Sequence, residues 1–165
     1  MKNILPALLI IFFTACNSNA DKTAETTNKS GSVTKNDLVK IKWITGNWRG
    51  MAEGKPFYEM YEMTNDSTIR ITGYEWNGKD SAGTHLSYIA WNNGAYYLGD
   101  SLNYKTTLID SSKIEMAPNY KANNSILFAF VNDSTWKAVL TGKKTVEYKM
   151  EKIPSISDMV KAANK

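Results

Sequence analysis

Apolar and polar residues alternate in short runs over most of the chain after residue 45. Trp136, Ala138 and Leu140 share one face of such a run, and residues 146–150 repeat the pattern with Val, Tyr and Met. Period-two alternation bounded by Asn, Asp, Ser and Gly is typical of antiparallel strands joined by tight turns. The pattern predicts ten strands, over residues 47–52, 56–63, 67–76, 83–92, 95–100, 104–110, 113–117, 124–132, 135–142 and 145–152.

Turn-forming residues separate these predicted strands at short, regular intervals. The dipeptide Asp-Ser occurs five times, and Asn77-Gly78 and Asn92-Asn93-Gly94 add turns in which Asn and Gly tolerate positive φ. Short strands with no helical pattern between them indicate an antiparallel meander, and closure of a long meander removes its two exposed edges. The predicted fold class is therefore all-β, an antiparallel up-and-down β-barrel.

Two short helices are predicted to flank the barrel. Thr34 and Asp37 have capping-box spacing and predict a helix over residues 35–44. Ser155 begins a second capping-box pattern, followed by an apolar stripe that consists of Ile156, Met159, Val160 and Ala163. Residues 126–131 are apolar on both faces, which indicates a strand that is also covered from outside. We expect the C-terminal helix to pack on the barrel wall and to provide that cover.

The first sixteen residues have the pattern of a secretory signal. Lys2 precedes an apolar run from Ile4 to Phe13, and two small residues then lead directly into Cys16, the one cysteine of the chain. The run is shorter than the roughly 20 residues that a membrane-spanning helix needs. The arrangement resembles the lipobox of bacterial lipoproteins, in a loose form like that of the Bacteroidota, and predicts lipidation of Cys16. The alternative is an ordinary cleaved signal followed by a free thiol.

Composition divides the rest of the chain. Residues 17–33 contain no aromatic residue and are mostly Asn, Ser, Thr, Lys, Ala and Gly, so they cannot bury enough apolar surface to fold. We expect a signal peptide over residues 1–15, a flexible tether over residues 16–33 and a lipocalin-like barrel domain over residues 34–165. More than one acyl chain on Cys16 would attach the protein stably to a membrane. The predicted location is the cell envelope, on the outer membrane and facing the periplasm.

The net charge of +4 and the pI of about 9.0 raise the question of nucleic-acid binding. The excess comes from lysines spread along the chain, with two arginines, Arg49 and Arg70, and no basic cluster. Dispersed charge of this kind indicates a solvated surface that faces an anionic membrane. We therefore expect no nucleic-acid partner.

A short motif begins the first predicted strand. Gly46-Asn47-Trp48, preceded by the predicted helix, resembles the Gly-x-Trp signature of the lipocalin or calycin superfamily. With Glu59-Met60-Tyr61 on the second strand, the segment is similar to the lipocalin-like domain called DUF6265. The resemblance implies that Gly46 and Trp48 close one end of the barrel, below a cavity.

Two departures from related barrels limit what this resemblance implies. Lipocalins stack a late Arg on the signature Trp. Because no Arg follows Arg70, the partner here would be a lysine such as Lys149, or it would be absent. The haem-binding nitrobindin group also opens with Gly-x-Trp-x-Gly, but it ligates haem with a His near the end of the barrel. The one His of this chain, His85, lies in the middle. We therefore expect no haem and no other cofactor.

His85 is also the residue on which any catalytic or metal hypothesis depends. A metal site needs several convergent ligands, and the chain has no second His and no Cys besides the predicted lipidation site. No Gly-x-Ser-x-Gly nucleophile motif is present either. We expect a non-enzymatic protein without a metal, since a hydrolase would require His85 and a carboxylate to line one cleft.

Aromatic residues with a few polar groups among them indicate a small-molecule cavity. The candidate ligand-binding residues are Glu59, Tyr61, Arg70, Tyr88 and Tyr96, with Glu59 and Arg70 as orienting charges. The predicted function is non-catalytic binding of a small, partly apolar ligand by a membrane-anchored barrel. Because side chains can also fill a small barrel completely, the alternative is a solid barrel that docks another envelope protein.

Overall fold

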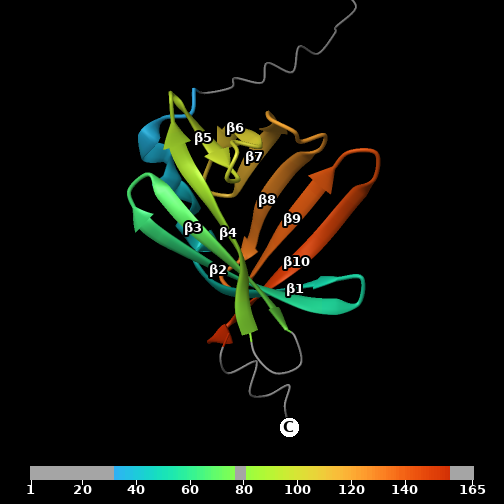
Figure 1. Cartoon of the computed structure of the whole chain (residues 1–165). Coiled ribbons are helices and arrows are strands. Elements are labelled where there is room, and N and C mark those ends of the chain that lie inside the picture. The colour runs from blue at the N-terminus through green and yellow to red at the C-terminus, as the bar shows by residue number, and fades with distance from the viewer. Residues whose placement is uncertain (1–31, 77–80, 157–165) are drawn as a thin grey trace, which may run out of the picture.

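Ten antiparallel strands wrap around one interior (Figure 1). The computed structural model describes residues 32–76 and 81–156. The predicted strands are all present, and each of their ends lies within two residues of its predicted position. The strands are β1 (Gly46–Ala52), β2 (Lys55–Asn65), β3 (Thr68–Trp76), β4 (Ser81–Asn92), β5 (Ala95–Leu98), β6 (Tyr104–Ile109), β7 (Lys113–Pro118), β8 (Ser125–Asn132), β9 (Thr135–Thr141) and β10 (Thr145–Ile153).

The sheet is a closed barrel, as the meander pattern predicted. Each strand pairs with the next one in sequence, and β1 also pairs with β10 and so closes the cylinder. Trp48 marks this closure, because it lies opposite Lys152 of β10 on one side and Glu59 of β2 on the other. Closure pairs the first strand with the last, which reduces the exposed sheet edge at which two copies of a protein can aggregate.

Helix η1 (Lys35–Ile44) precedes the barrel over the residues that the capping pattern predicted, and it is a 3-10 helix. The backbone N–H of Thr34 donates to the Asp37 carboxylate at 2.7 Å. Leu38, Ile41 and Ile44 are fully buried. The helix is kinked at Ile41, where φ is −102° and ψ is 25°, and the spacing of three residues still brings all three side chains to the buried side. That side belongs to the same apolar core as the barrel interior.

The predicted C-terminal helix falls mostly on residues 157–165, which lie outside the described residues. Ile156, the last described residue, packs with Tyr58 and Ile153 on the outside of the barrel near β2. Val131, on the outside of β8, is 48% exposed. In the described part of the chain, the cover predicted for residues 126–131 is therefore absent at Val131.

The signal, Cys16 and most of the tether also lie outside the described residues. Within residues 32–76 and 81–156, no helix combines the length and the apolar character that crossing a membrane requires.

The up-and-down order places alternate hairpin turns at the same end of the barrel. Helix η1 and the turns after β2, β4, β6 and β8 lie at one end, and the turns after β1, β5, β7 and β9 lie at the other. Three turns at the η1 end share one Asx pattern, in which the N–H of Ser67, Ser112 or Ser134 donates to an Asn or Asp side chain two residues earlier. We call the η1 end the closed end and the opposite end the open end.

Candidate functional site

Trp48 lies at the closed end, where η1 meets the barrel. Its side chain is 1% exposed, and its indole Nε1–H donates to the Ile44 carbonyl at 2.7 Å. The ring contacts Trp136 edge-on with centroids 5.9 Å apart. Gly46, with φ of 129°, begins β1 in a backbone conformation that favours glycine. These contacts join the helix, β1 and β9 into the layer that closes this end.

The cation beside Trp48 is Lys152, with Nζ 5.5 Å from the ring centroid. The prediction of a lysine such as Lys149 was therefore right in type and wrong in position. Lys152 pairs in register with Trp48, so both side chains lie on the same face of the sheet. Lys149 lies an odd number of residues away and points outward, where its Nζ donates to Glu151 at 2.9 Å.

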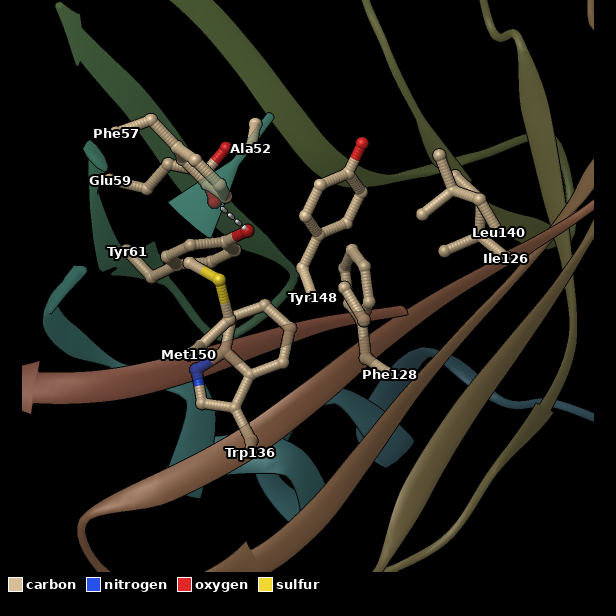
Figure 2. Close-up of a pocket in the computed structure, with 11 residues that line it drawn as sticks. Ala52, Phe57, Glu59, Tyr61, Ile126, Phe128, Trp136, Leu140, Tyr148 and Met150 are labelled. Carbon is tan, nitrogen blue, oxygen red and sulfur yellow. Dashed lines mark hydrogen bonds between the residues drawn. The ribbon is translucent and has the colours of Figure 1, made fainter. Parts of the chain in front are cut away.

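Above this layer, towards the open end, the barrel is hollow. One cavity of about 340 Å³ lies between β2, β8, β9 and β10 and has a mostly apolar wall. Figure 2 shows its aromatic side chains surrounding a common space, with Glu59 beside them. The aromatic lining residues are Phe57, Tyr61, Phe128, Trp136 and Tyr148.

A second cavity of about 370 Å³ lies on the side of β3, β4 and β5. Its wall is more polar and includes His85, Ser87 and Asp100. Glu59, Tyr61 and Phe128 line both cavities, so these residues stand at the boundary between them. The two cavities are thus neighbouring parts of one hollow interior.

Glu59 and Tyr61 form the polar centre of this interior. They lie two residues apart on the inward face of β2, and the Tyr61 hydroxyl donates to Glu59 Oε2 at 2.7 Å (Figure 2). Burial raises the pKa of Glu59 above its ordinary value, while the Tyr61 hydrogen bond and the nearby His85 act in the opposite direction. Burial and the neighbouring carboxylate raise the pKa of Tyr61 well above its ordinary value. Tyr61 therefore stays protonated and remains a donor.

A glycine separates Glu59 from His85 in the sheet. Glu59 pairs with Gly73 across β2 and β3, and Gly73 pairs with His85 across β3 and β4. Because Gly73 has no side chain, the carboxylate and the imidazole stand on either side of a gap in the wall. His85 and a carboxylate therefore line one cavity, which is the condition that a hydrolase would require. In the described part of the chain, no group of three or more His, Cys, Asp or Glu side chains is placed to hold a metal ion.

The structure separates the five predicted ligand-binding residues. Glu59 and Tyr61 line the cavities, but Arg70 points outward and pairs with Glu62 on the barrel surface. Tyr88 pairs in register with Arg70 and so shares its outward face. The reason is strand parity, because Ile69 and Ile71 are the residues of β3 that point into the core. Arg70 is therefore not an orienting charge in the cavity.

Tyr96 is buried, but at the closed end. Its hydroxyl donates to the Lys35 carbonyl of η1, and its ring contacts Trp91 with centroids 5.0 Å apart. Burial raises the pKa of this tyrosine above its ordinary value. Tyr96 therefore attaches the helix to the barrel and does not line either cavity.

The sequence prediction missed most of the aromatic wall. Phe128, Trp136 and Tyr148 line the first cavity from β8, β9 and β10. The available signal was the period-two alternation itself, since Trp136, Ala138 and Leu140 all face inward and all line the cavity. That pattern identified the inward faces without showing that they would leave a hollow.

Comparison of the chain with protein-family models, with curated proteins and with solved structures finds no match. The resemblance to the DUF6265 domain therefore stays a prediction.

Proposed function

We propose that this protein is a membrane-anchored lipoprotein whose barrel binds a small, partly apolar molecule without transforming it. The observation that carries the proposal is the hollow interior, which is closed by Trp48 and η1 at one end and whose first cavity is lined by five aromatic side chains. Ligand cavities in proteins usually measure about 300–1,000 Å³ and combine an apolar wall with a few polar groups. Both cavities have volumes in this range.

The shape of the wall also supports binding over docking. A solid barrel would fill its interior with the inward side chains of every strand, and its function would then depend on the outer surface. Here the closed end is packed in that way, whereas the open half keeps two cavities. Empty apolar space forfeits packing contacts, so a barrel built only to dock a partner has no physical reason to keep it.

Native mass spectrometry of the protein purified from its own host tests the binding proposal directly. We expect a co-purifying molecule, and we expect Ala138→Phe to remove it because Ala138 faces the first cavity. Ala129→Phe is the matched control, since Ala129 pairs with Lys137 on the outward face of the same two strands, β8 and β9. Equal retention of the molecule by both variants would contradict the proposed cavity.

The anchor is supported by the sequence pattern around Cys16 and is tested separately. Cys16→Ser should release the protein from the membrane fraction, because the acylated thiol would be the attachment point. Unchanged membrane retention of this variant would refute lipidation, and it would leave the binding proposal intact.

Acid–base chemistry is a second candidate function, favoured by the single fact that Glu59 and His85 line one cavity. A general base and acid at such positions would act on a substrate held between them. Incubation of the protein with its co-purifying molecule distinguishes the two functions. Recovery of the molecule with unchanged mass supports binding, and its conversion to a product supports catalysis.

A further inference from the structure

The interior of the barrel differs in charge from the chain as a whole. The chain has 20 lysine and arginine residues and a net charge of +4. Yet among the described residues that line the two cavities, none is a lysine or an arginine, whereas Glu59 and Asp100 are acidic. A basic protein thus encloses an acidic cavity.

Glu59 is the less exposed member of this acidic pair, since it is half-buried in the wall whereas Asp100 is exposed. Among the described residues, its carboxylate accepts one hydrogen bond, from Tyr61, and has no ion-pair partner. The other four described glutamates of β2, β7 and β10 pair with a lysine or arginine on the surface, namely Glu62, Glu115, Glu147 and Glu151. A buried carboxylate is normally paired because its desolvation is unfavourable. Among the described lining residues the basic side chain nearest in the sheet is His85, across Gly73, and it forms no ion pair with Glu59. The carboxylate therefore has room for a bound cation.

We propose that the ligand is an organic cation, an ammonium group on an apolar body, whose nitrogen binds Glu59 while the body lies against the aromatic wall. This inference rests on the proposed binding function. Since Tyr61 donates to Oε2, the carboxylate keeps lone pairs for the N–H donors of an ammonium head.

The aromatic wall fits the same chemistry. Phe57 and Tyr148 contact edge-on at 5.6 Å beside Glu59, and Tyr61 lies on its other side (Figure 2). The faces of such rings attract a cation and tolerate alkyl groups, so they accept an ammonium and its apolar body alike. A carboxylate ligand would instead place a second negative charge beside Glu59, which is unfavourable in a desolvated site.

Three probes that differ only in the head group test this inference: octylamine, 1-octanol and octanoate. Binding is measured by calorimetry at neutral pH and fixed ionic strength. A charge-assisted hydrogen bond in a buried site corresponds to about a ten- to hundredfold gain in affinity. We therefore expect octylamine to bind about ten- to a hundredfold more tightly than octanol, and octanoate to bind most weakly.

Glu59→Gln should reduce the octylamine affinity to that of octanol, because Gln can still accept the Tyr61 hydrogen bond but carries no charge. Glu62→Gln is the matched control on the outward face of the same strand and should leave all three affinities unchanged. Circular dichroism of both variants should match that of the wild type, which checks that they are folded.

The outcomes separate this inference from the function on which it rests. Equal or tighter binding of octanoate or octanol, or a preference for octylamine that survives Glu59→Gln, would overturn the cationic ligand and leave apolar binding standing. Absence of binding for all three probes would overturn both.

Discussion

The hydrogen bond from Trp48 to Ile44 is expected to be a main attachment of η1 to the barrel. Trp48→Phe removes the Nε1–H donor while it keeps an aromatic ring at a site that is 1% exposed. The Ile44 carbonyl then loses its 2.7 Å partner, and a buried polar group left unpaired costs about 1–3 kcal/mol. The two ring carbons that are also lost correspond to about 1.6 kcal/mol at roughly 0.8 kcal/mol for each buried group. We expect Trp48→Phe to lower the free energy of unfolding by about 3–5 kcal/mol in total.

Trp136→Phe provides a control with the same change in ring size. Trp136 is also 1% exposed, but its Nε1 has no hydrogen-bond partner among the described residues. This variant therefore loses the same ring atoms without leaving a carbonyl unpaired. Trp136→Phe also removes a buried N–H without a partner among the described residues, which is favourable. Trp48→Phe should therefore be less stable than Trp136→Phe by at least about 1–3 kcal/mol, the contribution expected from the hydrogen bond.

Urea unfolding followed by far-UV circular dichroism measures both free energies without relying on tryptophan fluorescence. The slope of the transition should stay the same, because neither substitution changes the surface exposed on unfolding by much. Effects of independent substitutions usually add to within about 0.5 kcal/mol, which sets the threshold for this comparison. If the two variants lose equal stability within that limit, the hydrogen bond does not attach η1 to the barrel and the reasoning is wrong.

Three further predictions concern Glu59, Gly50 and Arg70. Burial raises the pKa of Glu59, so its contribution to stability is present at low pH and is lost as the pH rises through that raised pKa. Glu59→Gln should therefore be more stable than the wild type at neutral pH. The gap should shrink as the pH falls through the raised pKa towards the ordinary value of 4.5, and it should stay constant below that value. Urea unfolding at several pH values checks this, and a gap independent of pH would contradict it. In Gly50→Ala the new Cβ would lie 2.2 Å from Cζ of Phe57, so the ring must move. Thermal unfolding should show that the free energy of unfolding falls by about 1–3 kcal/mol. A stability equal to that of the wild type would show that the ring can move without cost. Arg70→Ala breaks a surface ion pair with Glu62 and should change the free energy of unfolding by less than about 1 kcal/mol. The ligand affinity should stay the same. A loss of affinity would show that Arg70 takes part in binding.

The barrel could be predicted from the sequence because its elements are set locally. Alternation along each strand reflects burial of one face, and the Asx turns at Asn65, Asp110 and Asn132 depend on residues only two or three positions apart. Helix η1 was predicted for the same reason, through the spacing of Thr34 and Asp37. Its 3-10 geometry follows from the three-residue spacing of its buried face, a signal that the capping pattern alone does not contain.

The parts of the site that depend on pairing between strands could not be predicted from the sequence. Arg70 and Tyr88 were predicted to line a cavity because aromatic and charged residues are common in binding sites. On β3, however, Ile69 and Ile71 face the core, and parity then places Arg70 outside. The choice of Lys152 over Lys149 beside Trp48 likewise depends on the register of β1 with β10, which only closure of the barrel fixes. The alternation within each strand predicts which residues share a face. The pairing between strands determines which residues of other strands they contact.

The alignment of Glu59, Gly73 and His85 shows why stability and binding oppose each other in this barrel. A side chain at Gly73 would fill the gap and add packing contacts. An apolar residue in place of Glu59 would remove a desolvated carboxylate. Both changes favour folding. The chain instead keeps the carboxylate and the gap at the open half, and it concentrates fully buried residues such as Leu38, Ile41 and Trp48 at the closed end. Sites that reduce stability are typical of function, because a ligand completes interactions that the empty protein lacks. In this barrel the closed end therefore supplies the stability that allows a destabilising cavity to persist at the other end.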